Sequence, residues 1–599
     1  MTFGGVTTAT VHAFTRWWVE RVQALAASAW AAVRADRRAP FAFFVYAALI
    51  AGVTPPAVSW GIRLAFYAFA AFVFSIVWDR RVEPSMRALT ATERRWFRAL
   101  LCLAGATLLI SRILPFLRYG EAPLGYDTGF YLSSIDSTIG GIISGLGHRS
   151  TRALVWLPMA WLGIPKIVYL HGLYVLTQFG IAGSLYAFVR TIPALPRLAY
   201  GVTVAFLFAV SIPQFFVYWW MYYQTEIAIA FLLLTLTLLH RRSPFALLTG
   251  GFGAALHPAT SLPFAVALVL FLVVQLIRSL VRLRPLDADA RFLLILAVIG
   301  TLLASRFIDQ IDPFVRTYLR ATAFTYGWFL RGYPVHLQPQ MSGLYVTLPV
   351  VHLAAIYLLP FVCLSITLFV FRSLTSDPRA SRRFLFLVIY GVVLLVLNLT
   401  GVIYANRYLV YLDLVLIMIA APAFVRFVRR LLQDRVGSVV VILLGAGLLF
   451  YGGRIVAKQE AHITPAELAE VKAIGARAEP DAYAMTTISH YTPWVNAFSG
   501  LATIDPGYFR YNRWDYSQWQ EFWSGKSNAR RHELLRYYSR PIFVFVGSNA
   551  FEENLPYTRF IQTDPAFVRV SPHVWRYDPR TVTSQDIAAM REAETADPQ

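Results

Sequence analysis

Charged residues and cysteine are both scarce in this chain. Charged side chains make up 15% of its 599 residues, hydrophobic side chains make up 57%, and there are two cysteines. This composition excludes a water-soluble globular protein, because such domains carry about 25% charged residues. Cys102 and Cys363 both lie in apolar runs, so neither a disulfide framework nor a zinc cluster is available. We expect both to be small core residues.

Acidic residues are scarcer than basic ones. There are 33 Asp and Glu against 54 Lys and Arg, which gives a formal net charge of +21. In a soluble domain such an excess would indicate nucleic-acid binding. Residues 453–599, however, carry 16 Lys and Arg against 17 Asp and Glu, so the excess lies among the apolar runs. The distribution indicates membrane topology and no nucleic-acid partner.

The sequence shows no cleavable signal peptide, no repeat of fixed period and no low-complexity tract. It also lacks the matching interrupted helices of a transporter built from inverted repeats. Residues 1–40 combine Trp17 and Trp18 with several arginines. That mixture fits either an amphipathic helix on an anionic cytoplasmic leaflet or a plain positive segment beside the first span.

Apolar runs dominate residues 41–452 and predict a mainly α, polytopic transmembrane helical bundle with about 13 spans. Several runs are shorter than the roughly 20 residues that cross a bilayer, so one or two could be re-entrant. The runs are 41–54, 62–77, 97–115, 167–189, 198–218, 225–239, 245–257, 260–277, 292–304, 350–371, 384–402, 409–427 and 436–451.

Arginines are concentrated in alternate connections between these runs. If the N-terminus is cytoplasmic, all six inner connections contain arginine, whereas the outer connections 54–61, 213–224 and 257–260 contain neither Lys nor Arg. The positive-inside rule predicts this asymmetry. It places the long loops 116–166 and 305–349, together with residues 453–599, on the extracytoplasmic face of a bacterial cytoplasmic (inner) membrane.

Residues 453–599 have the composition of a soluble extracytoplasmic α/β domain. The sequence Thr464-Pro465-Ala466-Glu467 predicts a capping box that opens a helix ending near residue 477. Strands are expected at 482–487, 501–504 and 541–547, a helix or turn at 494–498, and one helix at 514–538. Residues 567–577 should close the layer. No glycine-rich phosphate loop is present.

Asp127 is the first candidate catalytic residue. It lies in Gly-Tyr-Asp-Thr-Gly-Phe, at residues 125–130, soon after an apolar run that ends near Pro115. An ionised Asp beside hydrocarbon is costly unless it has a function, and the alternative is that Asp127 caps a helix over 128–135. Asp136 would point roughly the opposite way on a continuous helix. We expect it to be an interfacial or structural group, with acceptor binding or metal orientation as its functional alternative.

Glu226 and His257 lie at outer helix ends. Glu226 begins an apolar run after an aromatic belt, so it either favours the helix dipole or orders an acceptor or a metal in the Asp127 cleft. His257 lies in the turn between two short spans. It is either a satisfied polar tip or a hydrogen-bond donor to a donor phosphate.

Arg407 lies between two spans on the face where few cations are expected. It is either a snorkelling anchor or a phosphate ligand. Arg331 and Tyr333, in the long outer loop 305–349, are further candidates for binding the donor phosphate. The aromatic stretch 507–519 either stacks on an acceptor glycan or packs the terminal domain.

The overall arrangement resembles the GT-C superfamily of integral-membrane glycosyltransferases. The features that carry the resemblance are an acidic residue in the first long outer loop, many further spans and a terminal outer α/β domain, with Asp127 in its motif and Asn406-Arg407-Tyr408 at an outer helix end. Members commonly show Asp-Asp or Asp-Glu in the first loop, whereas here Thr128 follows Asp127.

The resemblance implies an inverting hexosyl- or pentosyltransferase. It would move a sugar from a polyprenyl-phosphate donor to a cell-envelope glycan, lipid or protein, with Asp127 as base. A divalent cation, Mg or Mn, is a possible cofactor whose ligands the sequence does not identify. The alternatives are an oligosaccharyltransferase using a lipid-pyrophosphate glycan and a non-enzymatic lipid or glycan transporter, which would need polar groups at span midpoints.

Overall fold

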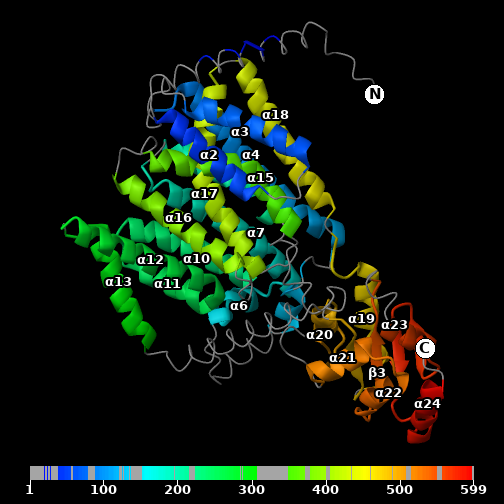
Figure 1. The fold of residues 1–599 in the computed structure, drawn as a ribbon. Helices are drawn as coiled ribbons and strands as arrows, with labels where there is room; N and C mark the ends of the chain where they lie inside the picture. Colours follow the sequence, from blue (N-terminus) through cyan, green and yellow to red (C-terminus); the bar gives the residue numbers. More distant parts are fainter. Residues whose placement is uncertain are drawn as a thin grey trace.

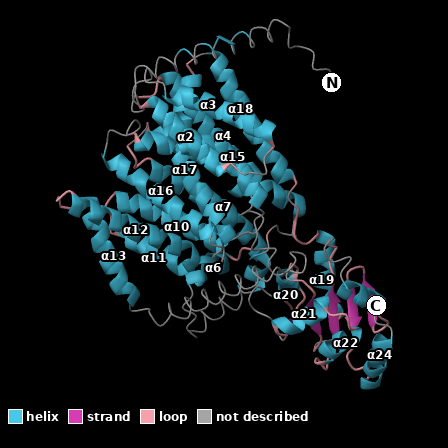
Figure 2. Cartoon of the chain, viewed as in Figure 1, coloured by secondary structure: helices cyan, strands magenta, loops and turns pink. Residues whose placement is uncertain are grey.

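The structure is a computed structural model that describes most of residues 38–596 and isolated positions before them. Outside the described residues lie the connections 55–58, 79–87, 121–124, 136–150, 194–195, 215–222, 306–347, 372–377, 400–404, 507–513 and 549–555 and eight single positions. Helices form a large bundle, and the strands lie together in the terminal domain (Figures 1 and 2). The predicted fold class, a mainly α helical bundle with a C-terminal α/β domain, is confirmed.

Each of the thirteen predicted apolar runs overlaps a bundle helix, and α6 adds a helix inside the predicted outer loop 116–166. The run 198–218 is longer than its helix, α8, which ends at Val210, and residues 215–218 lie outside the described residues. The bundle helices are α2 (Ala39–Val53), α3 (Trp60–Trp78), α4 (Ala91–Tyr119), α6 (Thr151–Leu162), α7 (Lys166–Val189), α8 (Arg197–Val210), α10 (Tyr223–His240), α11 (Phe245–Leu256), α12 (Pro258–Val281), α13 (Ala288–Ser305), α15 (Leu348–Val370), α16 (Pro378–Leu399), α17 (Ala405–Leu431) and α18 (Arg435–Ala457).

Eight of the described helices are long and apolar enough to cross a membrane. Four further apolar helices, α2, α8, α11 and the described part of α15, are shorter than 18 residues. The number of spans, about 13, therefore stays a prediction.

Helix α17 is the centre of the bundle. In its apolar window 89% of the residues are buried, against 11% in α18. It packs against α15, α16, α8, α3 and α18. Helices on the periphery expose large apolar side chains such as Leu64, Leu176 and Leu248, as expected for contact with lipid.

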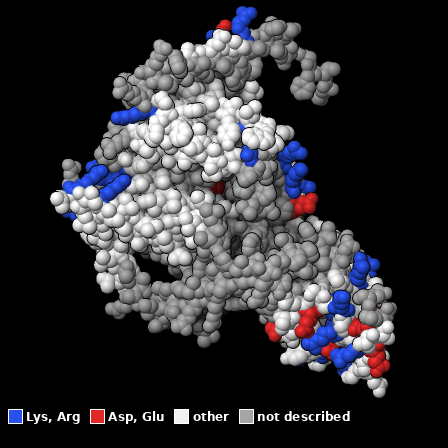
Figure 3. Space-filling model, in the orientation of Figure 1, with Lys and Arg blue, Asp and Glu red and all other residues white. Residues whose placement is uncertain are grey.

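Charge is distributed as the sequence predicts. Few charged side chains lie on the described surface of the bundle in Figure 3, whereas both signs cover the terminal domain. Within the bundle, Glu93 closes a capping box with Thr90 at the start of α4 and accepts a 2.8 Å hydrogen bond from Arg429 of α17. This ion pair ties the basic end of the central helix to a neighbouring span.

The terminal domain is a five-stranded sheet flanked by helices. The strand order is β2-β1-β3-β5-β4, with β1 parallel to β2 and β3, and with β5 antiparallel to β3 and β4. Its elements are α19 (Pro465–Arg477), β1 (Tyr483–Thr486), α20 (Thr492–Phe498), β2 (Ala502–Ile504), α21 (Tyr516–Ser524), α22 (Asn528–Arg536), β3 (Ile542–Phe545), α23 (Pro556–Thr563), β4 (Phe567–Ser571), β5 (Val574–Tyr577) and α24 (Ser584–Ala596).

Most sequence expectations for this domain are confirmed. Thr464 and Glu467 form the predicted capping box, and the strands fall where they were expected. The expectation of one helix over 514–538 is wrong. The helix stops at Ser524, and Ser527 caps a second one by accepting a hydrogen bond from the Arg530 N–H. Gly525 and the N-cap serine separate the two helices because each favours a helix end.

Candidate active site

Asp127 lies at the start of a short helical segment, residues 127–133, between α4 and α6. The segment is held by its apolar side: Leu132 and Ile135 are buried in a cluster with aromatic side chains of α6, α7 and α10. Asp127 itself is half-buried. The packing fixes the backbone that carries the carboxylate and leaves the carboxylate partly accessible.

The terminal domain covers another side of this segment. Gly129 is buried and its backbone approaches Pro493 of α20. Ala461 and Phe498 of the terminal domain pack against the cluster that holds the segment. Asp127 therefore lies where the helical bundle meets the terminal domain.

Glu226 is fully buried in the first turn of α10. The groups that act electrostatically on its carboxylate are Gln178 of α7, Arg112 of α4 and Asp127. Among the described residues, neither Glu226 oxygen accepts a hydrogen bond of regular geometry, and the Gln178 amide nitrogen likewise lacks a partner. Gln178 still acts on Glu226 as a hydrogen-bond donor, so the two groups partly satisfy each other and the Glu226 oxygens keep capacity to accept from a ligand.

Arg112 is the member of this site that sequence reasoning missed. Its side chain is fully buried, and both Nε and Nη2 donate to Oε1 of Gln178 at 3.3 Å. Nη1 donates to the Ser111 hydroxyl at 2.9 Å. The available signal was an arginine inside a predicted span, where an ionised group is costly and is usually functional.

Tyr223 connects Glu226 to the Asp127 segment. Its hydroxyl lies 3.5 Å from the Thr128 hydroxyl, and its ring meets that of Tyr131 edge to face with 5.2 Å between centroids. Tyr223 is one helical turn before Glu226, so the contact holds α10 against the segment. The contacts of Tyr223 therefore hold the helix that carries Glu226 beside the segment that carries Asp127.

His257 lies next to this group and caps α12. Its Nδ1 accepts from the Thr260 N–H at 3.2 Å and lies 2.6 Å from the Thr260 hydroxyl. Its Nε2 lies 3.4 Å from the hydroxyl of Thr225, the residue before Glu226. Because Nδ1 accepts the backbone hydrogen bond, the neutral ring carries its proton on Nε2. Both ring nitrogens of His257 therefore have polar partners within the protein, which agrees with the interpretation of His257 as a satisfied polar tip. Phosphate binding by His257 stays a prediction.

Arg407 lies in the first turn of α17, and this end of α17 contacts the start of α12, the helix that His257 caps. The side chain of the next residue, Tyr408, donates to the carbonyl of Ala259 at 3.5 Å, and Tyr411 meets the Thr260 hydroxyl at 2.8 Å. The start of α17 therefore packs on the start of α12. The Arg407 side chain itself lies outside the described residues.

A second buried carboxylate, Asp413, lies deeper in α17. It accepts hydrogen bonds from the Ser211 hydroxyl at 2.5 Å and from the Gln214 amide at 2.9 Å. Gln214 also donates to the carbonyl of Val410. The carboxylate is satisfied by these donors and connects the end of α8 to α17, so it has a structural explanation that Glu226 lacks.

The remaining sequence candidates lie outside the described residues. These are Asp136, Arg331, Tyr333 and the first half of the aromatic stretch, residues 507–513. The described second half of that stretch packs inward: Trp514 and Trp519 are buried and their rings meet with 4.8 Å between centroids. For these two tryptophans the packing interpretation holds.

No group of three or more His, Cys, Asp or Glu within the described part of the chain could hold a metal ion. Asp127 and Glu226 nevertheless supply two carboxylates that act on each other, and carboxylate oxygens are the ligands that Mg²⁺ and Mn²⁺ prefer. The described residues thus supply two candidate oxygen ligands, and a divalent cation at this site stays a prediction.

Comparison with solved structures identifies the fold. The crystal structure of the Archaeoglobus fulgidus oligosaccharyltransferase, in complex with Zn and sulfate, matches with a TM-score of 0.51 at 12% identity, over 74% of this chain and 68% of that chain. At this identity the likeness shows a shared fold.

A cryo-EM structure of the arabinofuranosyltransferase AftD from Mycobacteria matches with a TM-score of 0.47 at 13% identity, over 82% of this chain and 38% of that chain. A score below 0.5 supports no further conclusion. No protein-family model matches the sequence, and no curated protein matches it.

Proposed function

We propose that the chain is a membrane glycosyltransferase of the GT-C type, acting where the terminal domain meets the helical bundle. The observation that carries the proposal is the convergence of Asp127, Glu226 and Arg112 in a fold shared with an oligosaccharyltransferase. The donor is a polyprenyl-phosphate sugar and the acceptor a hydroxyl group of the cell envelope. A donor of this kind fits a site outside the cytoplasm, where nucleotide sugars are not supplied.

Asp127 acts as general base in this proposal. Its carboxylate takes the proton of the acceptor hydroxyl while the hydroxyl oxygen attacks the anomeric carbon of the donor. The bond from that carbon to the phosphate oxygen breaks, its electron pair stays with polyprenyl phosphate, and the configuration inverts. A half-buried carboxylate on a packed segment has both the access and the fixed position that the step needs.

Glu226 and Arg112 prepare the site electrostatically. Arg112 is fixed by Gln178 and Ser111, so its positive charge stays beside the two carboxylates and offsets part of their repulsion. Glu226 then orders the acceptor hydroxyl or, with Asp127, holds a divalent cation. When bound, such a cation would supply Lewis-acid stabilisation of the leaving phosphate.

The departing phosphate is neutralised by Arg407, with His257, Arg331 and Tyr333 as further ligands. The position of α17 supports the first two, because Tyr408 and Tyr411 hold its start against the helix that His257 caps. A guanidinium fork matches phosphate oxygens, and Arg407 and Arg331 are the two guanidinium groups that the proposal assigns to that purpose. Replacing Arg407 with Ala should mainly weaken donor use.

The proposed orientation places the site and the terminal domain outside the cytoplasm, with the N-terminus inside a bacterial inner membrane. Reporter fusions at residues 126 and 406 test this arrangement. Both positions must report the extracytoplasmic side, because the proposed base and the proposed phosphate ligand need one compartment.

The direct test is transfer of radiolabelled sugar from polyprenyl phosphate in membranes that contain Asp127→Asn. Loss of a general base should lower the rate by about 100-fold or more. Asp515→Asn is a matched control, because Asp515 is an exposed helix cap in the terminal domain and Asn also caps. An undiminished rate in Asp127→Asn would remove Asp127 from the base role.

A second candidate function is an oligosaccharyltransferase that uses a lipid-pyrophosphate glycan. Two observations favour this second function: the shared fold, and the carboxylates of Asp127 and Glu226, which act on each other and could bind a cation. Donor supply and chelation separate the two functions. Transfer from a pyrophosphate-linked oligosaccharide that stops with EDTA and returns with Mn²⁺ would establish the second; transfer from the monophosphate donor that survives EDTA would establish the first without a metal.

A further inference from the structure

A polar cavity lies at the end of α10 opposite to Glu226. On α10, Glu226 is in the first turn and His240 is the last residue, about 21 Å along the helix axis. At the His240 end is a cavity of about 330 Å³, lined by Arg190, Arg197, Arg241 and Arg383 together with His240 and Thr191. This volume is within the range of small-molecule sites.

Four guanidinium groups from the α7–α8 connection, the α10–α11 turn and helix α16 gather around this cavity, and none of the described residues that line it is acidic. The positive-inside rule explains why arginines occur at this end of each helix. It does not require them to converge on one space, which costs repulsion between like charges. The convergence indicates an anionic occupant.

Two of these guanidinium groups are held in place by the protein. Arg383 of α16 donates to the backbone carbonyl of Thr191 and, at 3.3 Å, to that of His240. Arg190, which follows α7, lies over the ring of Tyr186 at 5.0 Å from its centroid. Positioned forks of this kind match phosphate oxygens in two-point contacts.

A neighbouring arginine shows the contrast. Arg242 follows Arg241 in the chain but pairs with Asp289 of α13 at 2.6 Å and is not among the residues that line the cavity. Its charge is thus offset by an acidic partner within the protein, whereas no acidic residue is among the described residues that line the cavity.

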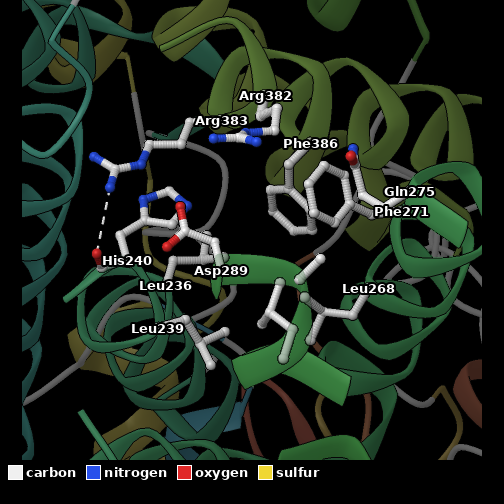
Figure 4. Close-up of a pocket in the computed structure, with 12 residues that line it drawn as sticks. Leu236, Leu239, His240, Leu268, Phe271, Gln275, Asp289, Arg382, Arg383 and Phe386 are labelled. Carbon is white, nitrogen blue, oxygen red and sulfur yellow. Dashed lines mark hydrogen bonds between the residues drawn. The ribbon is translucent and has the colours of Figure 1, made fainter. Parts of the chain in front are cut away.

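A recess with one apolar side adjoins the cavity and shares two of its residues, His240 and Arg383. Leu236, Leu268, Phe271 and Phe386 form the apolar side, and Gln275, Asp289 and Arg382 also line the recess. Figure 4 shows Arg383 bonded to the His240 carbonyl at the edge of this apolar group. A molecule with a phosphate at one end and hydrocarbon at the other fits this pair of spaces better than free phosphate does.

We propose that the cavity binds the phosphate head group of a membrane lipid, with the start of its hydrocarbon in the adjoining recess. Basic pockets between transmembrane helices recognise anionic head groups in this way. The lipid would lie in the leaflet opposite the candidate active site and would connect the α7–α8 and α10–α11 turns to α16. This site is separate from sugar transfer, and its test does not depend on the proposed function.

The test is native mass spectrometry of the detergent-purified full chain titrated with dioleoyl phosphatidylglycerol. Dioleoylglycerol, which has the same chains and no phosphate, is the first comparison. The double variant Arg190→Ala/Arg241→Ala should weaken phosphatidylglycerol binding by about tenfold or more. The matched double variant Arg278→Ala/Arg282→Ala removes the same charge from exposed positions at the end of α12 and should change it by less than about threefold.

A competition arm distinguishes lipid from free phosphate. Soluble glycerol 3-phosphate, the head group alone, should not displace the bound lipid at equal concentration. Displacement at equal concentration would assign the cavity to a soluble phosphate and overturn the lipid proposal. Equal losses in both double variants, or equal affinity for dioleoylglycerol, would also overturn it, because the cavity would then have no selective role.

Discussion

The backbones of Gly129 and Pro493 lie so close that a Cβ at position 129 would be 2.6 Å from the Pro493 carbonyl carbon. Gly129 is two residues after Asp127, and Pro493 belongs to α20 of the terminal domain. A contact this tight is possible only for glycine on the segment side. The glycine at position 129 therefore allows the segment that carries Asp127 to pack directly against the terminal domain.

The substitution Gly129→Ala should weaken the contact between the Asp127 segment and the terminal domain. The added methyl meets backbone, which cannot rotate away, so overpacking should cost about 1–3 kcal/mol and displace the Asp127 segment. We expect lower transfer and faster proteolytic release of the terminal domain in membranes. Gly172→Ala is the control, because a Cβ there meets nothing within 4 Å. Equal behaviour of the two variants would contradict the role of the contact.

The bundle was predictable because hydrophobic runs and helix caps are local signals. Each predicted run overlaps a helix. The start of α19 is set by hydrogen bonds between Thr464 and Glu467, which are only three residues apart in the sequence. The break between α21 and α22 was missed because the pattern of apolar residues continues across it. There the local signal was Ser527, whose capping of the next helix outweighs that pattern.

The candidate site was predictable only in part. Asp127 and Glu226 are visible in the sequence as acids at span ends, and the structure brings them together. Arg112 and Gln178 lie inside apolar runs, and their role in the site depends on contacts between different helices. Arg112 could be marked in the sequence as an unusual charge inside a span, but hydrophobic periodicity carries no information about such pairing and could not show that Arg112 belongs to this site.

Arg112→Ala should destabilise the bundle strongly. Removing one member of a buried charged group leaves Glu226 and Asp127 uncompensated, which costs about 3–5 kcal/mol. The measurement is the thermal unfolding midpoint in detergent. Arg98→Ala, on an exposed position of the same helix, is the control and should shift the midpoint little.

A double-mutant cycle separates packing from charge at this position. If Arg112 compensates Glu226, the effects of Arg112→Ala and Glu226→Gln should fail to add by about 0.5–3 kcal/mol. Strict additivity would mean that Arg112 acts on stability through its packing or through Gln178 alone.

Glu226→Gln should impair transfer more than folding. Gln has nearly the same size as Glu and keeps polar atoms beside Gln178, while Asp127 still faces the charge of Arg112, so the thermal midpoint should change little. Transfer should fall by about tenfold or more, because the acceptor or cation loses a ligand. Asp413→Asn alters another buried carboxylate that is satisfied by Ser211 and Gln214, and it should retain most activity. A similar loss in both variants would point to a general effect of bundle carboxylates.

Glu467 should make the terminal domain sensitive to acid. Burial alone would raise the pKa of Glu467, but hydrogen bonds from the Ser548 and Thr464 N–H groups outweigh it and hold the pKa below its ordinary value of 4.5. The carboxylate accepts from the Ser548 N–H at 2.7 Å and the Thr464 N–H at 2.8 Å. Since the folded-state pKa is the lower one, this stabilisation is present above pH 4.5 and is lost as the pH falls towards the folded-state value.

Unfolding of the terminal domain, followed by its tryptophan fluorescence, measures this effect. In Glu467→Gln the loss of stability between neutral pH and the acid range should be smaller than in the wild-type chain, because the variant cannot gain a proton there. At neutral pH the same variant should be less stable, since the amide accepts the N–H bonds more weakly than a carboxylate does. Glu592→Gln, on an exposed position of α24, should keep the wild-type pH profile. An unchanged profile in Glu467→Gln would assign the acid sensitivity to other carboxylates, such as Asp564, which His532 and the Ala566 N–H hold at a lowered pKa despite burial.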